Sequence, residues 1–429
     1  MNLLEAIRRK KNKMPTKTLQ KEKHKVPKLR FAGFEGGWEE KKLGGVAEIT
    51  SSKRVYSSDY VKTGIPFFRG KEISELKRSK TASDLLYIKE SKYLEFKNKF
   101  GVPQKDDILI TSVGTLGNIY RVNLGYDFYF KDGNLIWIKN PTMNSSFLEI
   151  LLDFHKKELL KGVIGSTQKA LTIDGIKKMN ILFPTLPEQQ KIAGFLGGVD
   201  EWIENLRAQK ESFESYKKAM MQKIFSQEIR FKDDKGNGFP EWGEKKLGEV
   251  FYSEKGDGIP KDAVVVDGTN ECILYGELYT KYKEVIFNIC SKTDSSDGLK
   301  SQVGDLLIPC STTTTGIDLA NVTALNKEGV LLGGDITVLR SKDTINNIFY
   351  AYYLSNYKKR EIAKYAQGST IVHLYYNHFK KIIIDIPTYA EQQKIADFLT
   401  SVDKVLESKQ QQITQAEQWK KGLMQGLFV

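Results

Sequence analysis

An internal duplication constrains the fold of this chain more than any other feature of its sequence. The hexapeptide EQQKIA occurs at 188–193 and again at 391–396, an offset of 203 residues. Without a gap, 188–225 and 391–428 share 18 identities in 38 positions. Further upstream, the segments around Trp38 and Trp242 align at an offset of 204. The chain therefore contains two copies of one unit, and each copy must form a structure that the other repeats.

Each copy holds a variable block between its conserved ends. Short β-branched and aromatic runs predict strands: IPFFR, DILIT and NLIWIK in the first block, and DLLIPC and DITVLR in the second. One amphipathic helix per block is predicted, at 147–161 and at 348–365. A short apolar strand then stops at Pro184 or Pro387, since proline cannot donate to a strand ladder. The pattern predicts two mixed α/β (α+β) domains.

The conserved end of each copy predicts a long helix, because apolar residues recur there with a heptad period. Two such helices in one chain are expected to pair as an antiparallel coiled coil with pseudo-two-fold symmetry. The predicted seam consists of Ile192, Phe195, Val199, Trp202, Leu206, Gln209, Phe213, Tyr216, Ile395, Phe398, Val402, Val405, Gln412 and Trp419. The equivalent Gln209 and Gln412 either fix the register or point partly to solvent, and the sequence does not distinguish these alternatives.

A second apolar stripe lies beside this predicted seam. It suggests that the helices contact more than each other. Its members are Leu196, Ile203, Leu399, Leu406 and Ile413.

The repeat sets the expected domain boundaries. We expect a basic N-terminal tail at 1–27, a first domain at 28–186, a first helical spacer at 187–232, a second domain at 233–386 and a second helical spacer at 387–429.

The charge of the chain is concentrated at its beginning. The formal net charge is +13, but residues 1–30 contain eleven Lys and Arg against Glu5 and Glu22, a local +9 that leaves +4 for the rest. This basic arm either contacts phosphates or is a solvated terminus. The net charge alone therefore does not establish nucleic-acid binding.

No motif for catalysis or metal binding is apparent. The segment GIPFFRGKE at 64–72 has one residue too many for a phosphate-binding loop and ends in Glu72 instead of Ser or Thr. Cys272, Cys290 and Cys310 are widely spaced, which suits a reducing cytosol and not a zinc site. The chain has no apolar run of 18 residues and no apolar leader at its start. We expect a non-catalytic, cytoplasmic protein without a membrane partner or a cofactor of its own.

The combination of these features resembles the specificity (S) subunits of type I restriction-modification systems. Both copies carry P-x-x-x-E-Q-Q-K-I-A followed by F-L and V-D, after a Gly-Ser-Thr and a variable block. The resemblance implies that each block is a target recognition domain for one half of a bipartite double-stranded DNA sequence. It also implies that the helices act as a ruler and dock two adenine-N6 methyltransferase (M) subunits and further restriction (R) subunits. S-adenosylmethionine, ATP and magnesium would then be bound by those partners.

A domain of this kind needs loops that carry polar and basic side chains for base edges and phosphates. The first block offers Lys53, Arg54, Arg69, Lys71, Ser112, Gly114, Thr115, Gly117, Thr167, Gln168 and Lys169. The second block offers Lys255, Lys261, Ser311, Thr312, Thr313, Thr314, Ser369, Thr370 and His373. Taken singly, each is more often a solvated loop residue, whereas the whole set favours DNA binding.

Two other classes of protein share part of this pattern. A freestanding two-headed DNA-binding protein or regulator would have the same domains but would not need helices with spare apolar surface. A pure assembly scaffold would need the helices but not two unlike α/β domains. A neighbouring methyltransferase gene would distinguish the S subunit from both.

Overall fold

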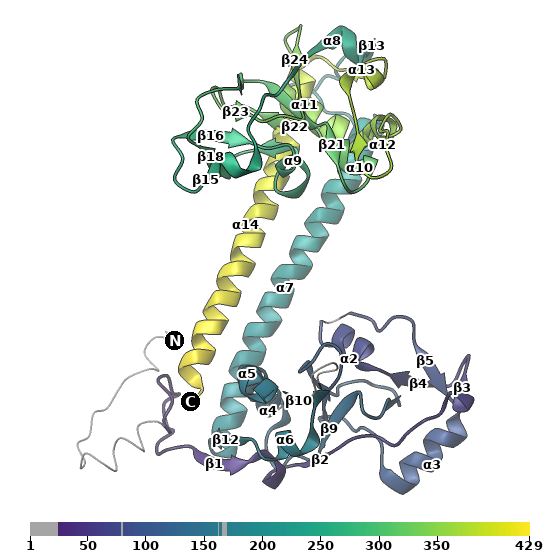
Figure 1. The fold of residues 1–429 in the computed structure, drawn as a ribbon, viewed down its shortest axis with the longest axis vertical. Helices are drawn as coiled ribbons and strands as arrows, with labels where there is room; N and C mark the ends of the chain where they lie inside the picture. Colours follow the sequence, from purple (N-terminus) through teal and green to yellow (C-terminus); the bar gives the residue numbers. More distant parts are fainter. Residues whose placement is uncertain (1–24, 79, 162, 165–169) are drawn as a thin grey trace, which may run out of the picture. The chain divides into compact units, whose positions relative to one another are not determined.

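The structure, a computed structural model, describes residues 25–78, 80–161, 163–164 and 170–429 (Figure 1). The chain divides into two compact units. Unit 1 extends to Leu206 and includes Gln412–Val429, whereas unit 2 comprises Arg207–Gln411. Each unit thus combines one variable block, called head 1 or head 2 below, with a segment of each long helix. The domain boundaries expected from the sequence remain predictions.

Head 1 contains two four-stranded sheets. The first has the order β2-β9-β6-β7, with β2 at Glu48–Thr50, β9 at Leu135–Lys139, β6 at Ile108–Thr111 and β7 at Ile119–Arg121. The second has the order β3-β5-β4-β8, with β3 at Tyr60–Val61, β5 at Leu86–Ile88, β4 at Ile65–Phe68 and β8 at Tyr129–Phe130. Two further pairs are β1 (Glu39–Lys42) with β12 (Asn180–Phe183) and β10 (Val163–Ile164) with β11 (Ala170–Leu171). The helices are α2 (Gly70–Leu76), α3 (Glu90–Phe100), α4 (Ser145–Phe154), α5 (Lys156–Lys161) and α6 (Ile173–Lys177).

Head 2 repeats this strand order with one strand added to each sheet. The first sheet is β14-β24-β20-β22-β17, at Phe251–Lys255, Ile336–Ser341, Asp305–Pro309, Thr323–Leu325 and Val285–Ile286. The second is β15-β18-β16-β23-β19, at Val264–Val265, Ser291–Thr293, Asn270–Ile273, Leu331–Leu332 and Leu299–Lys300. The remaining pairs are β13 (Gly243–Lys246) with β26 (Ile383–Ile386) and β21 (Ser311–Thr312) with β25 (Val372–His373). The helices are α8 (Leu247–Val250), α9 (Glu277–Thr280), α10 (Gly316–Leu319), α11 (Asn347–Tyr352), α12 (Lys359–Ala363) and α13 (Tyr376–Phe379).

The central strand of each head is apolar on both faces because both faces are covered. In β6, Ile108 and Ile110 belong to the core that includes α4 and the long helices, whereas Leu109 faces the core that includes Phe68. Such a strand reads as a continuous apolar run, which is how DILIT and DLLIPC identified β6 and β20.

The two predicted amphipathic helices are interrupted in the structure. The stretch 147–161 is divided at His155 between α4 and α5. The stretch 348–365 is divided into α11, a π-helical turn at Tyr353–Tyr357 and α12. Both stretches are helical as predicted, but neither is one straight helix. The second is not amphipathic over 349–355, because every side chain there is buried.

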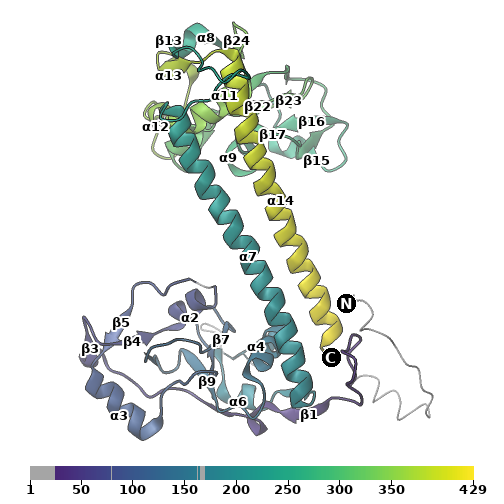
Figure 2. The same ribbon diagram turned by 180° about the vertical axis from the view of Figure 1, so that it is seen from behind.

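The long helices are α7 (Leu186–Phe225) and α14 (Tyr389–Leu427). In each unit a segment of α7 lies antiparallel to a segment of α14 (Figures 1 and 2). No helix within the described ranges has an apolar stretch long enough to cross a membrane.

The repeated hexapeptide attaches each long helix to its head. Glu188 is 1% exposed and accepts hydrogen bonds from the guanidinium of Arg30 at 2.8 Å. Next to it, the Gln189 side chain donates to the carbonyl of Pro184 at 2.9 Å and accepts from the backbone of Asn144 at 3.0 Å. Asn144 in turn caps α4. Through Glu188 and Gln189, the hexapeptide therefore joins the segment after the last strand, the helix of the head and the long helix.

The second copy makes the same attachment. Glu391 binds Arg230 at 2.8 Å. Gln392 donates to the carbonyl of Pro387 at 2.8 Å and accepts from the backbone of Asn346 at 2.8 Å.

One half of the predicted coiled-coil seam is wrong. At the centre of the helix pair in unit 1, Val199, Ile203 and Leu206 pack against Ile413 and Ala416. Ile203 and Ile413 of the second apolar stripe thus belong to the seam. Leu196 and Leu399 belong to the cores of head 1 and head 2, so this part of the stripe contacts more than the other helix, as the sequence suggested. The five side chains of the stripe, Leu196, Ile203, Leu399, Leu406 and Ile413, are between 0% and 5% exposed.

The displaced residues lie along the flanks of the helix pair. Trp202, Tyr216, Val405 and Trp419 are 48%, 45%, 38% and 45% exposed. The side chains of Gln209 and Gln412 are also exposed, while Phe195, Phe213 and Phe398 are half-buried. Aliphatic side chains fill the narrow space between the helices, and the larger rings pack against one another edge to face beside it, as in the pair Trp202 and Trp419.

Candidate nucleic-acid interface

In head 1, two segments that carry predicted DNA contacts, one with Lys53 and Arg54 and one with Ser112, meet the segment of Asp132 and Gly133. The Arg54 guanidinium donates to the Asp132 carboxylate at 3.1 Å. Ser112 follows β6, and its hydroxyl donates to the carbonyl of Gly133 at 2.8 Å. Ser112 is only 3% exposed, so its hydroxyl holds this turn. Lys53 is exposed, and its ammonium lies 5.0 Å from the ring centre of Phe100.

The loop that follows β6 presents backbone to solvent. Gly114 and Gly117 have φ angles of +78° and +70°, which favour glycine. Nothing lies within 4 Å of a Cβ built on Gly114, whereas one built on Gly117 would lie 3.3 Å from Leu160 and from Lys156. Gly114 and the exposed Thr115 are therefore open to a ligand, while Gly117 packs onto α5.

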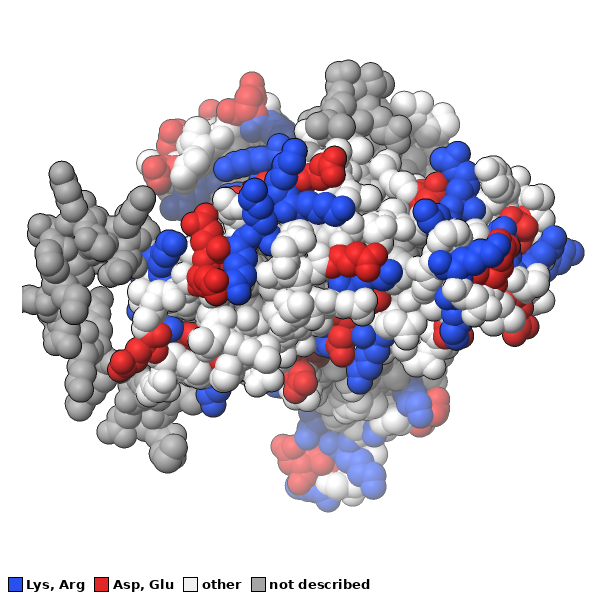
Figure 3. Space-filling view, turned by 90° about the horizontal axis from the view of Figure 1, so that it is seen from below, with Lys and Arg blue, Asp and Glu red and all other residues white. Residues whose placement is uncertain are grey.

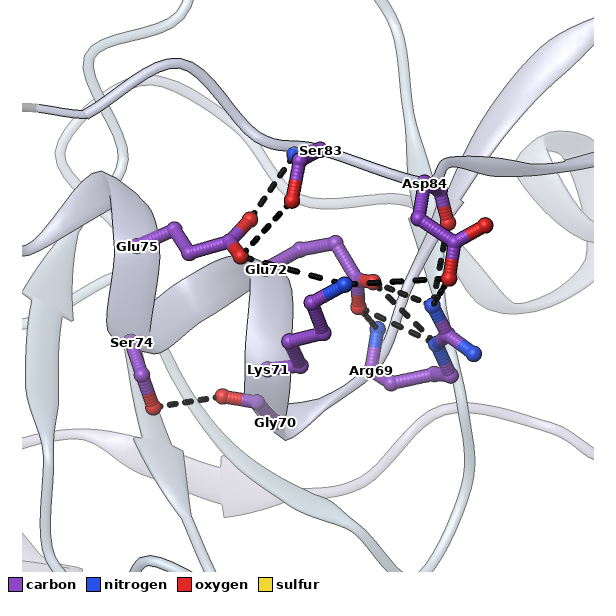
Figure 4. A network of polar contacts seen from close by, with 8 residues as sticks. All are labelled: Arg69, Gly70, Lys71, Glu72, Ser74, Glu75, Ser83 and Asp84. Carbon is purple, nitrogen blue, oxygen red and sulfur yellow. Dashed lines mark hydrogen bonds and ion pairs between the residues drawn. The ribbon is translucent and has the colours of Figure 1, made fainter. Parts of the chain in front are cut away.

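Arg69 and Lys71, at the start of α2, form a network of charges with three carboxylates (Figure 4). The Glu72 carboxylate accepts from the Arg69 backbone at 2.6 Å and from the Arg69 Nη2 at 2.6 Å. The hydrogen bond between the Arg69 side chain and Glu72 raises the pKa of Arg69. Asp84 places its Oδ2 at 3.7 Å from both the Arg69 Nη2 and the Lys71 Nζ.

The start of α2 lies against the loop that follows β6. A Cβ built on Gly70 would lie 3.6 Å from the Thr111 side chain and 3.7 Å from the Val113 carbonyl. The Asn118 amide also donates to the Ser74 hydroxyl at 2.8 Å. Arg69, Lys71 and the open Gly114 loop therefore belong to neighbouring parts of one surface.

In head 2, the threonine-rich segment after β20 pairs with the segment that contains the second Gly-Ser-Thr. Ser311 lies opposite His373 in the β21–β25 pair. Gln367 bridges His373, and the turn between these two residues leaves Ser369 and Thr370 exposed. His373 is half-buried and stacks on the ring of Tyr375 with centroids 5.7 Å apart.

The hydroxyls of this segment differ in availability. Ser311 and Thr312 are 5% and 2% exposed, and Ser311 donates to Asp335 at 2.9 Å. Thr313 and Thr314 are exposed, but Thr314 donates to Asp318 at 2.7 Å. Hydrogen bonds from Thr314 and Thr315 hold the pKa of Asp318 below its ordinary value. Among these four residues, Thr313 is the most available for a ligand.

Lys255 and Lys261 line a groove of ≈ 1130 Å³ in head 2 together with Tyr275, Lys281 and Asp335. Because Asp335 also holds Ser311, this groove adjoins the β21–β25 pair. The structure thus brings the predicted residues of head 2 to one region.

Three predicted residues, Thr167, Gln168 and Lys169, lie outside the described residues. The strands on either side of these residues, β10 and β11, pair with each other. Ala170 of β11 bridges Val113, so this pair lies beside the loop that follows β6.

The buried glutamates of the two heads were not predicted from the sequence. Glu72 and Glu277 are 0% and 6% exposed, and each accepts from the backbone of the residue three positions before it. The sequence did contain a signal for them. In RGKEI and YGELY, Glu72 and Glu277 follow the ends of the corresponding strands β4 and β16 at the same distance.

The charge pattern of the surface does not by itself define an interface. On the face drawn in Figure 3, basic and acidic side chains are interspersed. Among the described residues, no group of His, Cys, Asp or Glu is arranged to hold a metal ion.

Comparisons with known proteins agree with the duplication. The family model of the type I restriction modification DNA specificity domain matches the chain twice, at 35–214 and 240–418. A putative type I restriction enzyme MjaX specificity subunit of Methanocaldococcus jannaschii is 24% identical over 418 residues, which cover 90% of this chain and 92% of that protein. The putative specificity subunit S.HindORF215P of Haemophilus influenzae is 32% identical over 155 residues, 36% of this chain and 38% of that protein.

Solved structures show the same fold. The crystal structure of a type I restriction-modification S subunit from M. genitalium superposes with a TM-score of 0.58 at 16% identity, covering 94% of this chain and 99% of that one. A second structure, from work on complex assembly and conformational transition of the type I R-M system, gives a TM-score of 0.55 at 18% identity, covering 91% of this chain and 96% of that one.

Proposed function

Because the chain belongs to the family of type I restriction-modification specificity subunits, we propose that its two heads each read one half of a bipartite DNA target. The observation that carries this proposal is the repetition of one strand order in two heads with unlike loops. Two domains that recognise different half-sites need the same framework but different loops, because base recognition depends on the side chains that the loops present.

We also propose that the long helices hold the catalytic partners. These would be methyltransferase subunits, two in number, and restriction subunits. The flanks of the helix pair support this role, because Trp202 and Trp419 remain 48% and 45% exposed. Exposed aromatic residues of this kind are enriched at the centres of protein interfaces. S-adenosylmethionine, ATP and magnesium would be bound by these partners, so the chain itself would supply recognition and assembly.

The decisive experiment is to search the genome for a methyltransferase gene beside that of this chain, to co-express the two proteins and to map N6-methyladenine by single-molecule sequencing. The expected result is a split motif with a fixed number of unread bases. A soluble, assembled complex that methylates an unsplit motif, or nothing, would contradict the proposal and favour a freestanding DNA-binding protein.

A second arm tests modularity. Residues 240–385 would be exchanged for the second head of another family member that retains Trp242 and Asn346, which contact Glu391 and Gln392. One half of the motif should change. A change in both halves, or in neither, would contradict independent reading by the two heads.

A further inference from the structure

We propose that Arg69 reads a guanine base in the half-site bound by head 1, with Glu72 as the residue that positions its guanidinium. This inference rests on the proposed function and names the base edge that one side chain recognises.

Glu72 fixes the orientation of the arginine side chain. The carboxylate is fully buried, and its Oε1 accepts from the Arg69 Nε at 3.1 Å and from Nη2 at 2.6 Å. This side-on arrangement engages one edge of the planar guanidinium. Nη2 also donates to the Asp84 carbonyl at 3.0 Å. The guanidinium is thereby held in place before any ligand binds.

The outward part of the guanidinium remains available. Within the described part of the chain, the Arg69 Nη1 has no hydrogen-bond partner, and the side chain is 28% exposed. Nη1 keeps both of its hydrogens free of the described residues, whereas the two Nη2 hydrogens are donated to Glu72 and to the Asp84 carbonyl. Nη1 and Nη2 become a pair of parallel donors for a base when the outer hydrogen of Nη2 exchanges the Asp84 carbonyl for a base acceptor. Guanine presents the matching pair of acceptors, O6 and N7, in the major groove, and arginine is the side chain that meets them most often.

The local charge favours a base over a phosphate as the ligand. Glu72 already neutralises the guanidinium, and the Asp84 Oδ2 lies 3.7 Å from Nη2. A phosphate would have to approach both carboxylates, whereas the acceptors of guanine carry no formal charge. Arg69 is therefore suited to discriminate among bases instead of adding sequence-independent affinity.

Head 2 provides an internal comparison. Glu277 corresponds to Glu72, because it too is buried at the start of a helix and accepts from the backbone three residues earlier, at 3.0 Å. The residue at the position of Arg69 is Leu274, and the cation on Glu277 is Lys281 at 2.6 Å. Head 2 lacks a guanidinium at this point, so the guanine contact should occur in one half-site only.

The experiment uses the complex of the full chain with its methyltransferase and a fluorescent duplex carrying the mapped split motif. Each guanine is replaced in turn by 7-deazaguanine, which lacks the N7 acceptor. For the wild type, we expect one replacement in one half to weaken binding measurably and by less than the roughly 5- to 150-fold of a whole bidentate base contact, because O6 still accepts a hydrogen bond. The same replacements in the other half serve as the control for position.

Two variants assign the contact to Arg69. R69M/E72Q removes both charges together, so that no buried carboxylate is left unpaired, and should make binding insensitive to that replacement. E72Q keeps the arginine but weakens its positioning, and should reduce the sensitivity while leaving affinity for an unrelated duplex unchanged or raised. A merely structural role for Glu72 would change binding to both duplexes together.

Three results would overturn the inference: a half-site without guanine, no sensitive replacement in either half, or equal sensitivity in R69M/E72Q and the wild type. A split motif accompanied by any of these would leave the proposed function intact. Failure to obtain a split motif would reject both.

Discussion

The duplication supplies a matched pair of ion pairs, from which the largest predicted change in stability follows. Lys217 occupies the seam of the helix pair in unit 2 with its side chain 9% exposed. Its ammonium lies 2.8 Å from Asp403 and 3.3 Å from Glu284. Lys420 occupies the equivalent seam position in unit 1, where it contacts Asp200 at 2.5 Å with side chains 25% and 46% exposed.

The substitution Lys217→Met keeps most of the side-chain volume and removes the cation. It leaves Asp403 and Glu284, whose side chains are 13% and 15% exposed, without that partner. Removing one member of a buried pair costs about 3–5 kcal/mol, because the remaining charge stays desolvated. The matched substitution Lys420→Met breaks a pair whose members are more accessible to water, for which about 0.2–1 kcal/mol is typical.

The assay is thermal unfolding followed in each unit separately. Trp242 is the tryptophan of the 207–411 segment, so its fluorescence reports on unit 2, and hydrogen exchange reports on both units. For a unit of about 200 residues, these free energies correspond to a decrease in Tm of about 6–20 °C for K217M and at most about 4 °C for K420M. Equal decreases for the two variants, or no decrease for K217M, would refute the argument that burial makes the unit 2 pair essential.

Three further predictions concern other parts of the chain. G426A should destabilise unit 1 by about 1–3 kcal/mol, because the added Cβ would lie 2.5 Å from the Leu29 Cδ1. G422A should stabilise α14 by about 0.5–1 kcal/mol, because nothing lies within 4 Å of its added Cβ. Urea unfolding measures both changes in stability, and a change of the same sign in both variants would contradict the prediction. D84N should raise the affinity of the complex for unrelated duplex DNA and steepen the salt dependence of binding, because Asp84 faces both Arg69 and Lys71. Binding titrations at several salt concentrations measure this effect, with D174N at an exposed position as the control. Equal behaviour of the two variants would disprove the prediction. Burial acts to raise the pKa of Glu284, but Lys217 and Asn356 outweigh this effect and lower the pKa below its ordinary value of 4.5. The stability that Glu284 contributes is therefore present above pH 4.5 and is lost as the pH falls through the lowered pKa. In unfolding followed by Trp242 fluorescence, K217M should lose less stability below about pH 4.5 than the wild type.

The sequence predicted the framework of the heads because burial constrains it strongly. The runs IPFFR, DILIT and NLIWIK correspond to β4, β6 and β9, whose side chains face covered surfaces. The two heads keep one strand order although their sequences diverge, because alternating burial on two faces can be met by many aliphatic residues.

The site was less predictable, because exposure decides which polar side chains can meet a ligand. Ser112, Ser311 and Thr312 have the residue types of DNA contacts, yet all three are buried. Glu72, by contrast, has the residue type of an exposed helix position, yet it is fully buried and accepts a hydrogen bond from the backbone of Arg69. Availability depends on contacts between segments distant in sequence, such as Ser112 with Gly133, and periodicity does not reveal those contacts.

The coiled-coil seam shows why a heptad alone was ambiguous. Along α7, the apolar residues at Phe195 and Trp202 each precede another apolar residue, Leu196 or Ile203. Both sets repeat every seven residues, so periodicity supports either one as the second seam position. Side-chain shape decides between them, because two helices at close distance accommodate aliphatic knobs and displace large rings to the flank. That outcome buries Ile203 and Ile413 between the helices and leaves Trp202 and Trp419 exposed on the flank, so aromatic side chains dominate the apolar surface that the helices leave available to a partner.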